Sequence, residues 1–248
     1  MMNLIDAHCH LANLNQLMPV KPFLEEAKKQ GIFFWLSSVL TQSEIAWHQN
    51  NPDNRIAYSA GIHPCYDECD LELEDIEILC QKKRIWAIGE IGLDRNNPNY
   101  ECQVELFIAQ LELAKQYNLP VVLHLVGHTT EAYKILKQYN LQYLVHGYAG
   151  SLQGYKELLR LNTLFTISER LLKKDKKELL LAMIDSKRYL FETDITREYV
   201  KVGEKNPLLR LSSLVSSVAD LSGIMLEQLI TEQQRNFNGY EQSGFFQN

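Results

Sequence analysis

Residues 4–8, LIDAH, form a short apolar run, and seven further runs of this kind follow along the chain. The seven are FFWLSSV (33–39), IAYSAGI (56–62), IWAIGEI (85–91), PVVLHL (120–125), YLVHG (143–147), LFTIS (164–168) and YLFETD (189–194). Short runs rich in β-branched and aromatic side chains are typical of buried β-strands. The sequence therefore predicts eight strands.

Segments with helical spacing separate these runs. The clearest is 102–118, where apolar residues recur every three to four positions: Val104, Phe107, Ile108, Leu111 and Ala114. The last predicted helix follows Pro207, a residue that suits a first helical turn, and carries Leu208, Leu211, Val215 and Val218. Strict alternation of strand and helix predicts a parallel sheet, and eight units close a (β/α)8 TIM barrel. An open doubly wound sheet is the alternative, but no glycine-rich phosphate loop follows the first strand.

The composition is that of an ordinary globular protein. The chain has 248 residues, of which 46% are hydrophobic and 23% charged, and this length is common for a barrel of one domain, here 1–248. A net charge of −6 argues against general coating of nucleic acid but leaves room for a local basic patch. Five scattered cysteines without a C-x-x-C pair indicate reduced thiols. Without a signal-like start or a long apolar run, we expect a cytoplasmic protein that binds no membrane.

Two histidines stand at the end of the first strand, in IDAHCHL (5–11). Side chains two residues apart in a strand point to the same face, so His8 and His10 should project together. Four further candidate ligands lie toward the carboxyl ends of other predicted strands: Glu90, His124, His146 and Asp194. Barrel active sites are built at that end. Six imidazole and carboxylate ligands exceed the needs of one tetrahedral ion and suit two divalent metals bridged by a carboxylate.

A structural explanation of the same residues is the alternative. A histidine bonded to a carbonyl, or a carboxylate paired with an arginine, would account for any single position. It accounts poorly for six, because burying several uncompensated polar side chains would cost several kcal/mol. Glu192, on the same strand face as Asp194, is either a partner of a metal ligand or part of a core ion pair. His48, in a helix-like segment, is expected to be solvated.

Several stretches resemble one known family in order and spacing. They are IDAHCHL, GIHP, AIGEIGLD, AKQYNLPVVLH, VHGYAGS, LFETD, KNP and QQRNF, and the family is the TatD-like metal-dependent deoxyribonucleases of the amidohydrolase superfamily. The resemblance implies a (β/α)8 barrel with two divalent metal ions. It places one metal on the positions of His8, His10, Glu90 and Asp194, and the second on those of Glu90, His124 and His146. It also implies 3′-to-5′ hydrolysis of DNA, mainly in single strands.

Departures from the family pattern concern the substrate side. Relatives usually carry a second histidine after GIHP, where this chain has Cys65, and follow the strand-five histidine with Ser-Arg, where it has Leu125 and Val126. The metal ligands are all kept. A small-molecule metal-dependent hydrolase of the superfamily is therefore an alternative. Relatives of this kind also occur in bacterial anti-phage defence assemblies, so a subunit with a protein partner is another.

The predicted mechanism activates water at the metals. Asp194 would accept the water's proton while Glu90 bridges the two cations. His63, after strand three, would stabilise negative charge on the phosphoryl oxygens. A water or His128 would protonate the leaving oxygen. Nitrogen and oxygen ligands accept zinc, manganese, iron or, less readily, magnesium, so the sequence does not select among them.

Two basic segments are interpreted differently. SERLLKKDKK (168–177) follows a strand, so its cations should lie at the catalytic face and guide a polyanion such as a single-stranded DNA end. The predicted substrate-binding residues are Arg170, Lys173 and Lys174, joined by Arg95 and Arg197 from neighbouring loops. QKKR (81–84) precedes strand four, at the opposite end of the barrel, and is expected to be a solvated face.

Overall fold

The computed structural model describes residues 3–241 and contains eight parallel strands that pair in sequence order and close into a barrel. The strands are β1 (Leu4–Cys9), β2 (Ile32–Val39), β3 (Ile56–Ala60), β4 (Ile88–Asp94), β5 (Val121–Val126), β6 (Tyr143–Val145), β7 (Thr163–Ile167) and β8 (Tyr189–Phe191). Closure is made by the pairing of Asp6 in β1 with Phe191 in β8. The predicted (β/α)8 TIM barrel is confirmed.

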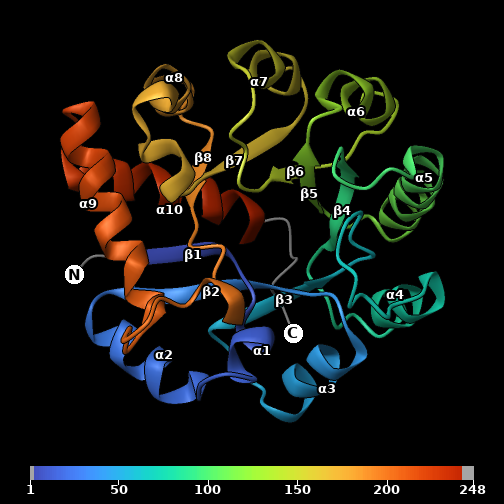
Figure 1. Cartoon of the computed structure of the whole chain (residues 1–248), viewed down its shortest axis with the longest axis horizontal. Coiled ribbons are helices and arrows are strands. Elements are labelled where there is room, and N and C mark those ends of the chain that lie inside the picture. Colours follow the sequence, from blue (N-terminus) through green and yellow to red (C-terminus); the bar gives the residue numbers. More distant parts are fainter. Residues whose placement is uncertain (1–2, 242–248) are drawn as a thin grey trace.

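Helices surround the strands on the outside, as Figure 1 shows. They are α1 (Leu11–Asn15), α2 (Val20–Lys29), α3 (Gln42–Asn50), α4 (Leu73–Gln81), α5 (Tyr100–Tyr117), α6 (Thr129–Leu136), α7 (Leu152–Leu158), α8 (Lys177–Ser186), α9 (Arg210–Ser222) and α10 (Leu226–Glu241). Within 3–241, no single helix is long and apolar enough to cross a membrane, and only the bent pair Pro207–Ser222 and Leu226–Gly239 meets both criteria jointly.

The barrel interior is apolar toward the amino ends of the strands. Ile5, Leu36, Val122, Leu144 and Leu190 belong to one buried cluster there, each from a different strand. Helix α10 packs against the same cluster through its Phe237 side chain. Because that end is filled by hydrocarbon, polar side chains of the interior can gather only at the carboxyl ends of the strands.

Two expectations about element bounds were wrong. The fourth strand was predicted over 85–91 but pairs over 88–94, so that Glu90 lies inside the strand. The helix after Pro207 is not the last, because α10 follows it. β4 runs close to β5 at Gly92, where a Cβ would clash with the carbonyl oxygen of His124, and apolar periodicity does not reveal such backbone contacts.

The prediction that His48 is solvated was wrong, because the structure buries its side chain. Helix α3 packs against the barrel, and the His48 side chain is only 6% exposed. Its Nε2 lies 3.2 Å from the Ser37 hydroxyl, and its ring stacks on Tyr58 with 4.7 Å between centroids. Burial lowers the pKa of His48 to about 3. The face that α3 turns inward is set by packing, because its apolar pattern is too weak to predict it.

Candidate metal centre

The first donor set surrounds one oxygen of Glu90. Glu90 Oε1 lies 3.2 Å from His8 Nε2 and 3.0 Å from His10 Nε2. Asp194 Oδ1 lies 3.7 Å from each of the same two nitrogens. His8 and His10 therefore project together, as their spacing predicts, and meet carboxylates from β4 and from the segment after β8.

The second donor set surrounds the other oxygen of Glu90. Glu90 Oε2 lies 2.8 Å from His146 Nε2 and 3.6 Å from His124 Nδ1. These two ring nitrogens are 3.1 Å apart. Each carboxylate oxygen of Glu90 thus faces a separate pair of histidines, which is the arrangement needed for a carboxylate that bridges two cations.

The backbone around the centre is held by β1 and β8. The Thr193 amide and hydroxyl donate to the buried Asp6 carboxyl at 2.9 and 2.6 Å, and the Asp194 amide donates to the His8 carbonyl at 3.0 Å. Asp194 has a positive φ of 52°, which is uncommon for a residue other than glycine. These bonds hold the backbone of His8 and Asp194, one from each end of the chain, beside each other.

Burial and neighbouring charges shift the pKa values of the residues in the centre. Glu90 is only 2% exposed, and within 3–241 neither its Oε1 nor His8 Nε2 makes a hydrogen bond of acceptable geometry. Burial raises the pKa of Glu90, but the surrounding histidines, His8 foremost, outweigh burial and leave the pKa well below its usual value. Burial by itself lowers the pKa of His10. The Glu90 carboxylate outweighs this effect and raises the pKa of His10 to about 9. Cations are therefore stabilised here, and the imidazole and carboxylate donors fit divalent metals.

His63 acts differently from the other histidines. Its Nδ1 accepts a hydrogen bond from the Cys65 amide at 2.9 Å, so the neutral ring carries its hydrogen on Nε2. Burial, reinforced by nearby His124, lowers the pKa of His63 to about 3, which keeps the ring neutral. Nε2 lies 3.8 Å from Glu90 Oε2. This geometry makes His63 a hydrogen-bond donor at the edge of the centre.

Asp94 is a site residue that the sequence analysis did not select. Its Oδ2 lies 2.8 Å from His124 Nε2 and fixes the ring so that Nδ1 faces Glu90 and His146. Burial lowers the pKa of His124, but Asp94 and Glu90 raise it to about 9. The signal was present, because Asp94 ends the stretch AIGEIGLD four residues after Glu90, a spacing that returns to one face of a strand.

Comparison with known proteins identifies one matching family model. The family described as TatD related DNase matches residues 5–241. The chain belongs to this family. A human relative, named deoxyribonuclease TATDN3, is 24% identical over 94% of this chain and 92% of its own length. A relative from Haemophilus influenzae, named an uncharacterized metal-dependent hydrolase, is 32% identical, and the match spans only about half of each chain, 50% here and 53% there.

Solved structures of TatD proteins share the fold. YjjV, a TatD homologue from Escherichia coli K12, superposes with a TM-score of 0.82 at 23% identity, over 95% of this chain and 96% of that one. A TatD family hydrolase from Entamoeba histolytica superposes with a TM-score of 0.77 at 16% identity, over 95% and 96% of the two chains. At these identities, the superpositions support the barrel and not a particular substrate.

A cavity of about 370 Å³ opens above the donor sets of this TatD family member. Its lining adds polar and aromatic residues that the sequence analysis did not select: Asn13, Glu44, Tyr66, Asn96, Thr196, Glu198 and Tyr199. They lie on loops, on α1 and α3, and in the 3-10 helix Arg197–Tyr199, where no periodic pattern marks them. A larger cavity of about 700 Å³ lies at the amino ends of β3 and β4, beside Lys82, Lys83 and Arg84, and contains none of the predicted ligands.

Among the predicted substrate-binding cations, Arg170 alone lines the 370 Å³ cavity. Its Nη2 lies 2.7 Å from Asp194 Oδ2, while 42% of its side chain stays exposed. Lys173 and Lys174 are exposed after the short turn at Glu169–Leu172, outside the cavity lining. Arg197 is bound by Glu68, Glu198 and Gln16. Arg95 is exposed and extends along Gly127.

His128 lies away from the donor sets. It caps the start of α6 with a positive φ of 49°, and its ring packs on Tyr100 with 4.8 Å between centroids. It is not part of the lining of the 370 Å³ cavity. The structure brings together all six predicted metal ligands, His63 and Arg170, and it places His128 and the other four cations farther out.

Proposed function

We propose that this TatD family member is a metal-dependent phosphodiester hydrolase with two divalent cations, acting as a 3′-to-5′ exonuclease on single-stranded DNA. Glu90 carries the proposal, because its two oxygens face separate donor sets. His8, His10 and Asp194 would hold one cation, and His124 and His146 the other, with Glu90 between them. When bound, such cations acidify water and stabilise charge on phosphoryl oxygens.

The chain's own residues supply the remaining steps. Asp194 is positioned as proton acceptor, because Oδ1 faces the histidines while Arg170 holds Oδ2. The neutral His63 ring donates from Nε2 to a phosphoryl oxygen, a contact of the kind often worth about 3 kcal/mol in the transition state. Arg170 binds the phosphate from the opposite wall and replaces the arginine that relatives carry after strand five.

The size and lining of the cavity support a single-stranded end as the proposed substrate. Its volume of about 370 Å³ lies in the usual range for a small bound group such as a terminal nucleotide. Tyr199 lines the cavity and is 54% exposed, so its ring is available for stacking with a base. Support for DNA also comes from the family description and from the human relative's name.

The test is a time course on one oligonucleotide labelled at its 3′ end or its 5′ end, with manganese, magnesium, zinc or a chelator. We expect immediate release of the 3′ label as a mononucleotide, and a descending ladder from the 5′-labelled strand. The double variant His8→Ala with His10→Ala should be inactive. Equal cleavage of a circular single strand, or full activity with chelator or in the double variant, would contradict the proposal.

A small-molecule hydrolase is the second candidate. The observation that favours it is the scarcity of cations around the cavity, since Arg170 is the one predicted substrate-binding cation in its lining. Complete inertness toward oligonucleotides, together with metal-dependent hydrolysis of lactones, cyclic amides or phosphotriesters, would select this candidate.

A further inference from the structure

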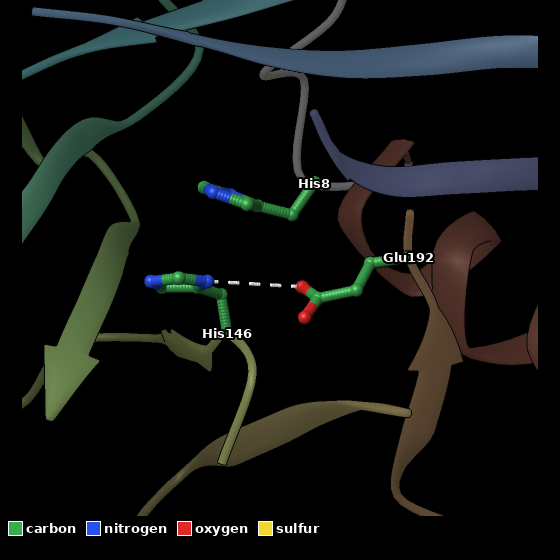
Figure 2. A group of neighbouring side chains, drawn as sticks. All are labelled: His8, His146 and Glu192. Atoms are coloured by element: carbon green, nitrogen blue, oxygen red, sulfur yellow. Dashed lines mark ion pairs between the residues drawn. The ribbon is translucent and has the colours of Figure 1, made fainter. Parts of the chain in front are cut away.

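The carboxylate of Glu192 points at the His146 ring, as Figure 2 shows. The residue directly follows β8 and is 0% exposed. Its Oε2 lies 3.9 Å from His146 Nδ1. In the described part of the chain, neither carboxylate oxygen of Glu192 nor His146 Nδ1 makes a hydrogen bond of acceptable geometry. Thr166 is a further side chain beside the Glu192 carboxyl group. His146 Nδ1 therefore faces a buried carboxyl group at a distance just beyond that of a hydrogen bond.

Buried polar atoms of this kind require partners. Burial, followed by the nearby Asp194 carboxylate, raises the pKa of Glu192 well above its usual value. The charged and the neutral carboxyl group both keep an oxygen that can accept the Nδ1 hydrogen of His146, and a buried ring N–H left without an acceptor costs about 1–3 kcal/mol. A displacement of about 1 Å would bring Glu192 and His146 to hydrogen-bond distance. Gly147, whose φ is +55°, leaves room for both Glu192 and Arg170: a Cβ built there would lie 3.0 Å from Arg170 Nη1 and 3.2 Å from Glu192 Oε1.

The neighbouring histidine shows the same arrangement completed. Asp94 binds His124 Nε2 at 2.8 Å, which turns the other nitrogen, Nδ1, toward Glu90. For His146 the nitrogens are exchanged, because Nε2 faces Glu90 at 2.8 Å and Nδ1 faces Glu192. A carboxylate thus stands behind each histidine of the second donor set.

We propose that Glu192 is a positioning residue that accepts the Nδ1 hydrogen of His146 and keeps the His146 Nε2 lone pair directed at the second metal position. The inference rests on the proposed metal centre. Outer carboxylates of this kind fix the tautomer and orientation of a ligating imidazole, and their loss typically weakens metal binding by about 10- to 100-fold. Glu192 touches neither substrate nor reacting atoms and acts through His146.

The test compares Glu192→Gln with wild type by titration of manganese or zinc against a competing chelator. We expect the weaker of the two metal affinities to fall by about 10- to 100-fold, as in Asp94→Asn. Glu44→Gln is the matched control, because it also removes a buried carboxyl, but one that lines the cavity and is hydrogen-bonded to the Leu40 amide at 2.7 Å. Its metal affinities should change much less.

A second measurement detects positioning directly. Nitrogen-15 spectra of the histidine rings should show His146 of the metal-bound wild type protonated at Nδ1. In Glu192→Gln, the ring should lose this fixed tautomer, while thermal unfolding of the metal-free variant stays close to that of wild type. A structural role for Glu192 alone would change the unfolding temperature and leave the tautomer unchanged.

Specific outcomes would overturn the inference. Equal metal affinities and an unchanged His146 tautomer in Glu192→Gln would refute it. The ligand atoms of His8, His146 and Glu192 lie within 4.8 Å of one another. If the wild type bound three metal ions and the variant bound two, Glu192 would be a metal ligand together with these histidines, and the inference would be wrong. A wild type that binds metal without cleaving DNA refutes the proposed exonuclease only.

Discussion

Arg170 offers the sharpest test of how the cavity binds a phosphate. Its guanidinium has one nitrogen on Asp194 Oδ2 at 2.7 Å, and the partly exposed remainder has donors free for a substrate oxygen. We consider Arg170→Gln, which keeps much of the side chain's length and removes the charge. The variant should lower kcat/KM for an oligonucleotide and leave metal content unchanged.

The expected changes in kcat/KM and in stability follow from two interactions of the guanidinium, one with the substrate phosphate and one with Asp194. A hydrogen bond to a charged group is worth about 1.5–3 kcal/mol, so its absence in the transition state lowers kcat/KM by about 10- to 150-fold. Stability should change far less, because an ion pair with an arginine exposed by 42% contributes about 0–1 kcal/mol. For a chain of this length that is a shift in Tm of at most about 4 °C.

The assay is steady-state hydrolysis at several salt concentrations, with Tm and metal content measured on the same samples. Lys82→Gln with Lys83→Gln is the control, because these exposed cations lie at the opposite end of the barrel. Arg197→Gln is a second control, since Glu68 and Glu198 already bind its guanidinium. Equal reductions in all three variants would indicate bulk electrostatics, and an unchanged kcat/KM in Arg170→Gln would refute phosphate binding by Arg170.

Four further predictions concern other parts of the chain. Glu90→Ala should lose more metal than Glu90→Gln by elemental analysis, and both should be inactive, because an amide cannot replace a bridging carboxylate; unchanged metal and rate in Glu90→Gln would exclude the bridge. His63→Ala should lower kcat by about 10²- to 10³-fold with metal content retained, whereas loss of metal would make His63 a ligand. Charge reversal at Lys173 and Lys174 should raise KM for an oligonucleotide at low salt and reduce the salt slope of binding by about 0.7 for each phosphate that is no longer neutralised. The folded pKa of His48, about 3, lies below its ordinary 6.5, so below pH 6.5 the unfolded chain binds a proton that the folded chain excludes. Stability should therefore fall by about 2 kcal/mol from pH 7 to pH 5 in denaturant titrations, and this part of the slope should vanish in His48→Gln.

The barrel and the candidate metal ligands can be predicted from the amino-acid sequence without any coordinates. Alternation of apolar runs with helical spacing is a local property, and a parallel sheet of eight units has one natural closure. The ligands follow from the same pattern, because parallel strands bring their carboxyl ends to one mouth and residues such as His124 and His146 stand there after apolar runs. Residue type and position along each strand are sufficient for this.

Which of those residues contact one another, and which role each can take, is decided only by the tertiary structure. The two oxygens of Glu90 separate the donor sets, and Glu192 comes to lie behind His146, through side-chain geometry that no spacing encodes. Arg170 reaches the cavity while Arg197 is held by Glu68, although both are loop arginines in the sequence. Loop paths and side-chain partners depend on contacts between segments far apart in the chain, whereas strand and helix patterns depend on neighbours within a few residues.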